Sequence, residues 1–367
     1  MADEMAMGAE ERFVRESFAQ HYRKVVLSVH AVEQREFGFG GWEKKIEFRH
    51  IKIKSAAELQ GKLALEAPLY VSYSVSYYEF PEARPMPKKS WLGADLVFDL
   101  DAQPHECGKF TCSECLEKVK HDTAHLIEEF LMEDFGVQKH EIEVNFSGSR
   151  GYHVHVRNSN ILKLDRDARR EIADYISGVG VSFDRFFWKE GKKLFGPTPT
   201  QEGYGGKFAA SFCKKLEDEK FANSIWRGLK SQKGRLVEAI GRGDWGSCGI
   251  PGFEKKLQKA FEEMKKELSV MIDSNVTADV TKLIRLPDSL HGGSGLVAKK
   301  VKNLDAFDPM RDAVAFGKEE VKIKLLEKIP SLLIGDFSFG PADAGCVLEV
   351  PKFAAIYLLC KKAATLA

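Results

Sequence analysis

The sequence predicts an α+β protein that carries a mostly helical insertion. Residues 95–101 and 141–146 combine apolar and polar side chains in patterns typical of β-strands. Between them, residues 116–135 place apolar side chains on one face of a helix, and Gly136 suits the position just after it. Residues 161–268 are predicted to be mostly helical, with glycine-rich breaks. This order of strands, helix, strands and a helical block is an α+β pattern.

Each predicted element rests on side-chain periodicity or on turn-forming residues. In chain order, these elements are a helix over 9–32, a turn-rich loop over 35–41, strands over 45–53 and 69–75, a proline-rich loop over 81–87, a strand over 95–101, a helix over 116–135, strands over 141–146 and 152–156, charged helices over 165–178 and 253–270, and strand and turn over 284–301. The chain has 367 residues and no internal repeat. We predict a discontinuous core over 1–160 and 269–367, with the helical insertion over 161–268 between its parts.

Charge and hydropathy limit the classes of function. The formal net charge is only +1, so any surface that binds nucleic acid must be local. No stretch of the sequence has the length of a membrane span, and the acidic start Met-Ala-Asp-Glu-Met is not a signal peptide. We therefore expect a cytoplasmic protein with no membrane partner.

Asp99 and Asp101 end an apolar run. On a β-strand, alternate residues share a face, so both carboxylates would point the same way while Phe98 and Leu100 pack on the other side. Paired carboxylates at a strand end suit Mg²⁺ or Mn²⁺, which prefer oxygen ligands. The chain has 54 acidic residues, so a solvated pair that arises by chance is the alternative. A buried-type strand that ends in two charges favours the metal site.

Three of the seven cysteines lie close together, directly after this strand. Cys112 and Cys115 have the spacing of a zinc knuckle, Cys107 precedes them, and His105 would complete a Cys₃His tetrahedron. His121 on the following helix competes with His105 for the fourth place. With four protein ligands the site over 103–121 would be closed, so we predict structural rather than catalytic zinc.

The segment Ser147-Gly148-Ser149-Arg150-Gly151 tightly joins two predicted strands. Its glycines allow close approach of the backbone, and its hydroxyls and amides suit a phosphate. Arg150 supplies a guanidinium, and His153 on the outgoing strand can point toward the same site. An ordinary hairpin with a solvated arginine is the alternative.

A second polar block follows the helical insertion. Arg285, Ser289 and His291 alternate across a strand and a turn, which makes a second phosphate clamp plausible. Asp273 could complete a three-carboxylate site with Asp99 and Asp101. A lone aspartate in a turn is more often a helix N-cap, and spacing alone does not separate the two roles.

In this order and spacing, these blocks resemble the small, catalytic subunit of archaeal and eukaryotic DNA primase over most of residues 13–300. The resemblance also includes Arg35-Glu36-Phe37-Gly38-Phe39. The direct run from Leu283 to Gly292 and the compact layout are similar to the archaeal branch. The resemblance implies a primase-type catalytic core built on an RRM-like β-sheet, together with the zinc-binding knuckle and the helical insertion.

The resemblance also implies roles for individual residues. Asp99, Asp101 and Asp273 would be the catalytic carboxylates that coordinate Mg²⁺ or Mn²⁺, with Asp279 as a competitor for the third place. The residues expected to hold the nucleotide are Arg35, Ser147, Arg150, His153, Arg285, Ser289 and His291. Ser149 departs from the pattern, because some relatives carry a second arginine there.

The implied activity is DNA-dependent primase. Such an enzyme makes short primers de novo, of RNA or alternatively of DNA, on a single-stranded DNA template by two-metal nucleotidyl transfer during DNA replication. Its expected partners are a primase large subunit in a heterodimer, the template and nucleoside triphosphates. Two alternatives remain at this point: a metal-dependent phosphohydrolase with an aspartyl nucleophile, and a zinc-bearing nucleic-acid-binding module without catalysis.

Overall fold

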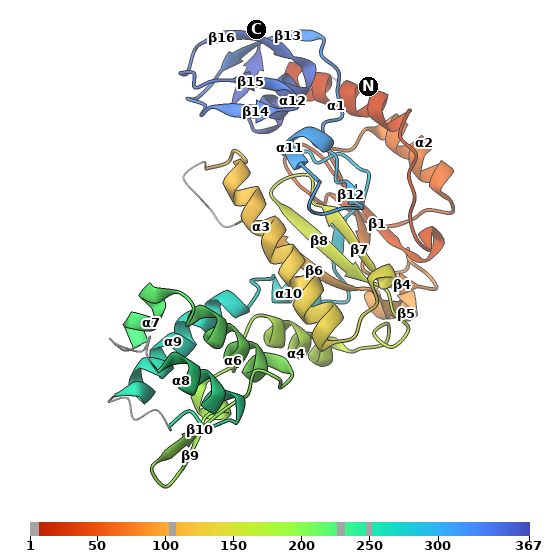
Figure 1. The fold of residues 1–367 in the computed structure, drawn as a ribbon. Helices are drawn as coiled ribbons and strands as arrows, with labels where there is room; N and C mark the ends of the chain where they lie inside the picture. The colour runs from red at the N-terminus through yellow and green to blue at the C-terminus, as the bar shows by residue number, and fades with distance from the viewer. Residues whose placement is uncertain (1–6, 103–107, 226–231, 247–251) are drawn as a thin grey trace. The chain divides into compact units, whose positions relative to one another are not determined.

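The structure is a computed structural model that describes residues 7–102, 108–225, 232–246 and 252–367 (Figure 1). The chain divides into two compact units. The core unit consists of Met1–Ala124, Val137–Arg170 and Asp273–Ala367, and the helical unit consists of His125–Gly136 and Glu171–Ile272. Helix accounts for 39% of the chain and strand for 22%, a mixture that agrees with the predicted α+β class.

The core unit contains most of the strands. Its elements are α1 (Ala9–Tyr22), η1 (Val32–Gln34), β1 (Glu36–Gly40), β2 (Phe48–Lys52), α2 (Ala56–Glu66), β3 (Tyr70–Ser74), β4 (Ser76–Tyr78), η2 (Met86–Lys89), β5 (Trp91–Ala94), β6 (Leu96–Asp101), α3 (Ser113–His125), η4 (Lys139–Glu141), β7 (Ile142–Phe146), β8 (Gly151–Val156), α10 (Ser274–Ala278), β11 (Leu283–Arg285), β12 (Lys300–Val301), α11 (Pro309–Asp312), β13 (Glu320–Leu325), β14 (Leu332–Ile334), β15 (Phe337–Phe339), β16 (Val347–Pro351), α12 (Lys352–Cys360) and β17 (Ala364–Leu366).

One four-stranded sheet has the order β11-β3-β1-β2, with antiparallel neighbours. Its strand β1 corrects the prediction of a loop over 35–41, since Glu36–Gly40 form a buried strand inside the sheet. The glycines that suggested a turn serve close packing instead, because a Cβ on Gly40 would lie 2.3 Å from the carbonyl oxygen of Lys45. Backbone approach therefore explains this glycine better than a turn does.

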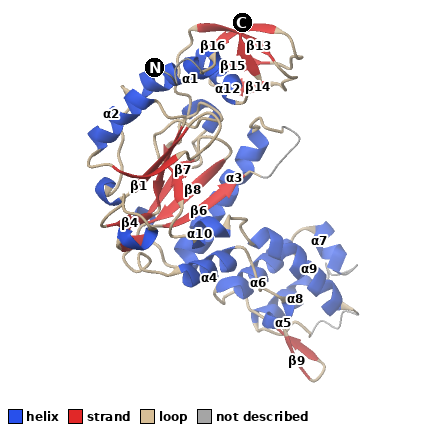
Figure 2. Ribbon diagram, turned by 180° about the vertical axis from the view of Figure 1, so that it is seen from behind, coloured by secondary structure: helices blue, strands red, loops and turns tan. Residues whose placement is uncertain are grey.

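The second four-stranded sheet has the antiparallel order β12-β7-β8-β6, and Figures 1 and 2 show α3 beside it. The strands predicted over 95–101, 141–146 and 152–156 are confirmed as β6, β7 and β8. Phe98 and Leu100 of β6 are buried, whereas the residues between and after them are carboxylates. β6 therefore packs Phe98 and Leu100 on one face and carries Asp99 and Asp101 on the other, as the alternation requires.

The first helix is shorter than predicted. It ends at Tyr22 rather than at residue 32. Phe18 and Tyr22 are completely buried, but Val26 is 83% exposed, so the apolar pattern beyond Tyr22 does not follow a buried helix face. A further sheet, β16-β13-β17, packs with α12 near the C-terminus, where the sequence carried little motif information.

The helical unit is almost wholly helical apart from one hairpin (Figure 2). Its elements are η3 (Leu126–Asp134), most of α4 (Arg166–Ile176), α5 (Phe183–Phe186), β9 (Trp188–Glu190), β10 (Lys193–Phe195), α6 (Gly203–Lys215), α7 (Glu219–Ile225), α8 (Lys233–Gly241) and α9 (Phe253–Leu268). Aromatic side chains form its core, where Phe208 contacts Phe212, Trp245 and Phe261. The predicted insertion over 161–268 covers nearly the same residues, but it omits the segment 125–136.

In the part of the chain that the structure describes, no helix combines the length and the apolar character needed to cross a membrane.

Candidate active site

Asp99 and Asp101 lie on the polar face of β6, near the C-terminal end of the strand. β6 pairs with β8, and this register sets Asp99 opposite His153 and Asp101 opposite Gly151. Asp99 is mostly buried, and its Oδ1 lies 3.5 Å from His153 Nε2. Within the described residues, this oxygen accepts no hydrogen bond. A buried carboxylate oxygen without a partner is costly, so it requires a ligand or a proton.

Asp273 reaches the same place from a distant part of the chain. Its backbone N–H donates to the carbonyl oxygen of Asp99 at 3.0 Å, and its side chain caps α10 by accepting from the Asn275 N–H at 2.9 Å. Burial and the charge of Asp273 raise the pKa of Asp99 to about 6. Burial and the charge of Asp99 raise the pKa of Asp101. The three carboxylates therefore repel one another at one end of the sheet.

Asp279, the competitor for the third place, lies in a different environment. Its carboxylate accepts from the backbone N–H and the hydroxyl of Thr281, at 2.8 and 2.7 Å, which is the bonding of a turn-forming aspartate. The geometry supports Asp273 as the third carboxylate.

Mutual repulsion and an unbonded carboxylate oxygen fit a site for a divalent cation, because a cation would neutralise the charge and take up the free oxygen. Hard oxygen donors also match Mg²⁺ and Mn²⁺. Across the described ranges, however, no three His, Cys, Asp or Glu side chains already stand together as a ligand group. The residue types fit the predicted metal, whereas the side chains are not arranged as a finished coordination shell.

The predicted phosphate loop follows β7 and is closed by its first serine. Ser147 Oγ accepts from the backbone N–H groups of Ser149 and Gly151, at 3.3 and 3.2 Å, so its own proton is free to donate. Gly148 has a φ of +83°, and a Cβ on it would lie 2.7 Å from the Cβ of His291. The loop and the second polar block therefore touch, and only glycine fits between them.

Arg285 and His291 belong to the second predicted phosphate-binding block, and both side chains contact Tyr70. The Arg285 guanidinium lies over the Tyr70 ring at 4.9 Å and donates to the Val71 carbonyl at 3.2 Å. Its Nε is buried and has no hydrogen-bond partner among the described residues. The His291 ring meets the Tyr70 ring edge-on, with centroids 5.4 Å apart. Tyr70 thus holds both side chains in place.

The two histidines of the site are neutral near pH 7. Burial lowers the pKa of His153 to about 3, with further lowering from His155 and Arg285, and burial also lowers the pKa of His291. His291 Nδ1 accepts from the Gly293 N–H at 3.1 Å, so the ring proton is assigned to Nε2. A neutral imidazole in this tautomer can donate a hydrogen bond to a phosphate oxygen.

The other predicted nucleotide contacts have mixed outcomes. Arg150 Nη1 donates to the Gly108 carbonyl at 3.2 Å, and the charge of Arg150 helps to lower the pKa of Asp101, so Arg150 borders the carboxylates. Ser289 is completely buried and donates its only hydroxyl proton to the Leu286 carbonyl. Ser289 therefore shapes the turn before His291, which corrects its prediction as a phosphate ligand.

Arg35 is also corrected. Its guanidinium is completely buried, binds Asp95 Oδ2 at 2.8 Å and donates to the carbonyls of Ser74 and Val75 at 2.8 and 2.9 Å. Arg35 therefore links the chain before β6 to the end of β3 rather than facing a nucleotide. The motif that begins at Arg35 therefore did not reveal that this side chain is buried.

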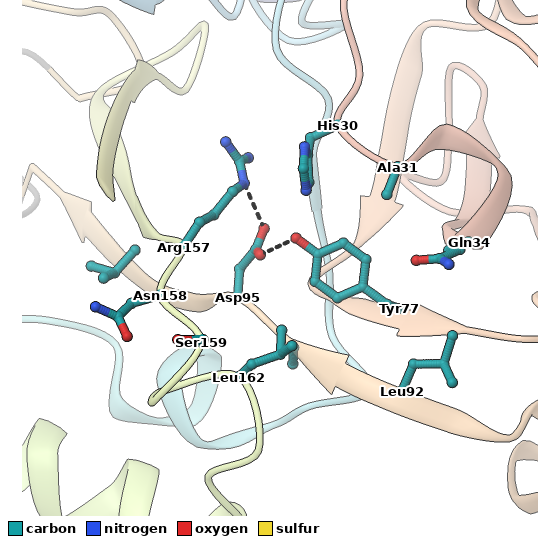
Figure 3. A pocket seen from close by; sticks show the side chains of 12 residues that line it. His30, Ala31, Gln34, Tyr77, Leu92, Asp95, Arg157, Asn158, Ser159 and Leu162 are labelled. Carbon is teal, nitrogen blue, oxygen red and sulfur yellow. Dashed lines mark hydrogen bonds and ion pairs between the residues drawn. The ribbon is translucent and has the colours of Figure 1, made fainter. Parts of the chain in front are cut away.

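Asp95 stands at the other end of β6 and is fully compensated. It accepts from Arg157 Nε at 3.2 Å and from the Tyr77 hydroxyl, beside a cavity of about 370 Å³ that His30 also lines (Figure 3). Burial alone would raise the pKa of Asp95, but His155, Arg35 and Arg157 lower it well below its ordinary range. At this end of the sheet, arginine side chains balance the charge of the buried carboxylate, whereas Asp99 at the other end lies beside further carboxylates.

The predicted zinc knuckle is only partly described. Cys112 and Cys115 lie at the start of α3, with their sulfur atoms 2.9 Å apart. His105 and Cys107 lie outside the described residues. His121, the alternative fourth ligand, is 82% exposed on α3. The zinc site stays a prediction.

Three lysines lie at the site, and their effect on its carboxylates and histidines was not predicted from the sequence. Lys45 and Lys282 lie near enough to Asp99 to lower its pKa, although burial outweighs them. Burial lowers the pKa of Lys361 to about 8, and the charge of Lys361 in turn helps to lower the pKa of His291. Isolated lysines carry no motif, so only tertiary contacts reveal these three.

The fold and the site together define a class of enzyme. Clustered carboxylates at a strand end, bordered by arginine, lysine and neutral histidine donors, are the arrangement that nucleotidyl transfer requires. The family model for the DNA primase small subunit matches residues 98–302. The chain is 34% identical to the DNA primase small subunit PriS of Methanothrix thermoacetophila, covering 95% of this chain and 97% of the relative.

Other archaeal relatives agree. The chain is 34% identical to the PriS proteins of Archaeoglobus fulgidus and Thermoplasma acidophilum, over 95% and 93% of its length. These alignments cover 96% of each relative. The chain therefore belongs to the DNA primase small subunit family. The resemblance found in the sequence and the enzyme class that it implied, a primase-type nucleotidyltransferase, are confirmed.

Proposed function

We propose that this chain synthesises short primers de novo on single-stranded DNA, using divalent metal held by Asp99, Asp101 and Asp273. The observation that carries the proposal is the buried Asp99 oxygen, which has no hydrogen-bond partner among the described residues and lies beside two further carboxylates. When bound, Mg²⁺ or Mn²⁺ would make the attacking 3′-hydroxyl more acidic and neutralise charge on the leaving pyrophosphate.

The basic rim would hold the triphosphate of the incoming nucleotide. Arg150 and Arg285 supply fixed positive charge, and Ser147, His153 and His291 supply neutral donors. Neutral histidines suit this task because they bind phosphate oxygens without adding charge that would weaken metal binding by the carboxylates. These residues therefore orient the α-phosphorus toward the primer end.

We further propose that β6, α3, β7 and β8 form the RRM-like part of the core. This proposal is supported by the order of the elements, β-α-β-β, and by the antiparallel pairing of β8 with both β6 and β7. In this arrangement the carboxylates and the phosphate loop meet where β6 ends and β8 begins.

Structural zinc at Cys107, Cys112 and Cys115 is proposed on the spacing of the cysteines and on the closeness of the two described thiols. His105 is the expected fourth ligand and His121 the alternative. The cluster would stabilise the segment between β6 and α3.

The expected partners follow from the reaction and from the family. As the small subunit of a primase, the chain would pair with a large subunit that assists binding of the first nucleotide. Its other partners would be the template and nucleoside triphosphates. The primers would be of RNA, with DNA primers as the alternative.

The test is incorporation of labelled nucleotides on single-stranded DNA without a primer. We expect polymer that requires template and Mg²⁺ or Mn²⁺, and Asp101→Ala should abolish it while the melting temperature is kept. Arg84→Gln, a change at an exposed arginine of the core unit, is the control and should leave synthesis intact. Release of phosphate without polymer would favour the phosphohydrolase, and template binding without either reaction would favour the non-catalytic module.

A further inference from the structure

The β9–β10 hairpin of the helical unit presents an exposed aromatic pair. Trp188 is 53% exposed, although large aromatic side chains are usually covered. It lies opposite Phe195 in the register, and the two rings stack with centroids 6.0 Å apart and planes inclined by 21°. Figures 1 and 2 show the hairpin extending beyond the helices of its unit.

The hairpin is anchored, so this pair is held in place. Leu194, on the opposite face from Trp188, is buried in the core of the helical unit, and its carbonyl accepts from the Trp245 N–H at 2.9 Å. Lys189 on that same face pairs with Glu254 of α9 at 2.8 Å. The indole N–H donates to Glu190 at 3.3 Å, which fixes the ring orientation. One ring face of Trp188 rests on Phe195, and more than half of the side chain meets solvent.

The charge around the aromatic pair is locally positive. Residues 183–195 contain four basic and two acidic side chains, whereas the whole chain has a formal net charge of only +1. Lys192 and Lys193 are exposed at the turn, and neither forms an ion pair with any residue that the structure describes. Lys193 lies opposite Glu190, on the same face as Trp188.

We propose that this hairpin binds single-stranded DNA, with a base stacked on Trp188 and the backbone held by Lys192 and Lys193. An open indole face next to free lysines is the combination that single-strand binding proteins use without reading sequence. The exposed apolar area is only one aromatic pair, too small for a stable protein interface. The proposal rests on the proposed function only in assuming that template is the ligand.

The first test measures binding of labelled oligo(dT) by fluorescence anisotropy, with chelator and without nucleotides. Trp188→Ala should weaken binding by about tenfold, the scale of one lost base stack, and Trp188→Phe should keep most of the affinity. Trp91→Ala is the matched control, because Trp91 is 37% exposed in the core unit. Equal affinities for Trp188→Ala and wild type would overturn the proposal.

The second test uses the salt dependence of the same binding. Changing Lys192 and Lys193 together to Gln should lower the slope of log Kd against log salt by about 1.4, two phosphate contacts at about 0.7 each. Lys255 and Lys259, exposed on α9, give a control pair with the same change in charge. An unchanged slope in the hairpin variant, or the same decrease in the control, would contradict the proposal.

Neither binding assay contains nucleoside triphosphate or divalent metal. The proposal for the hairpin and the proposed catalytic function can therefore be contradicted independently of each other. Loss of primer synthesis in Asp101→Ala with unchanged oligo(dT) binding leaves the hairpin proposal standing. Melting curves of each variant exclude a loss of affinity that comes from unfolding.

Discussion

Asp95 and Asp99 belong to one continuous stretch of chain but lie in opposite electrostatic environments. Asp95 is surrounded by Arg35, Arg157 and the Tyr77 hydroxyl, so its ionised form is stabilised. One oxygen of Asp99 has no hydrogen-bond partner in the part of the chain that the structure describes, and burial and the neighbouring Asp273 raise the pKa of Asp99 to about 6. Environments that push carboxylate pKa values apart separate a structural role from a functional one.

A substitution of Arg35 tests the structural role of Asp95. Replacing Arg35 by Gln removes a buried guanidinium that binds Asp95 and the carbonyls of Ser74 and Val75, so we expect a loss of about 3–5 kcal/mol in the free energy of unfolding, measured with urea. Arg84→Gln, at an exposed site, should change it by less than about 1 kcal/mol. A stable Arg35→Gln enzyme with a raised KM for nucleotide would instead restore the phosphate contact predicted from the sequence.

Glu143 gives a pH-dependent prediction. Burial would raise its pKa, but the hydrogen bonds and charge of Arg157 outweigh burial and lower the pKa to about 2. A carboxylate with a lowered pKa in the folded state stabilises the protein above its ordinary pKa of 4.5, and this contribution is lost as pH falls from there toward 2. At pH 7 the free energy of unfolding of the wild-type protein should therefore exceed that of Glu143→Gln by about 1–2 kcal/mol.

Urea unfolding of both proteins across this pH range is the measurement. The difference between them should shrink as the solution is acidified below about pH 4.5. A difference that stays constant down to pH 3 would show that Arg157 does not act through the charge of Glu143.

At the scale of elements, the sequence predicted those with strong periodicity and missed those set by tertiary packing. β6, β7 and β8 were predicted because alternation requires no knowledge of neighbours. β1 was missed because its glycines suggested turns, whereas they permit close approach of backbone from the 44–45 segment. α1 was predicted too long because apolar residues continue past Tyr22, where Leu27 is buried although it lies outside the helix.

The loop between β7 and β8 gives a prediction at this scale. Gly148→Ala forces a side chain into a left-handed backbone and against His291, so we expect a loss of about 1–3 kcal/mol in unfolding free energy and a raised KM for nucleotide. Gly61→Ala in α2 has open space and should stabilise by about 0.5–1 kcal/mol. Unchanged nucleotide affinity in a destabilised Gly148→Ala would separate this loop from the site.

The cysteine pair at the start of α3 gives a second prediction at this scale. Cys112→Ser should lower the melting temperature more than it lowers activity per folded molecule, because a closed zinc site is structural. Cys213→Ser, at a half-buried thiol of the helical unit, is the control. Full zinc content and an unchanged melting temperature in Cys112→Ser would argue against zinc at this cluster.

At the scale of the whole molecule, the candidate site combines residues from three distant parts of the chain. The pairs Asp99 and Asp101, and Ser147 and His153, are local and could be predicted from spacing. Asp273 was proposed by resemblance, since only the fold brings its backbone to Asp99. Lys282 and Lys361 carried no signal, because a lysine acquires a role here only through the charges that folding places beside it.

The central claim is that Asp273, and not Asp279, completes the metal site with Asp99 and Asp101. Binding of Mn²⁺, followed by electron paramagnetic resonance of the free ion during titration, tests it most directly. The account predicts that Asp273→Asn weakens Mn²⁺ binding by at least about tenfold, because a coordinating charge is removed, while Asp279→Asn binds as wild type does. Equal Mn²⁺ binding by wild type and Asp273→Asn, or loss of binding only in Asp279→Asn, would contradict it.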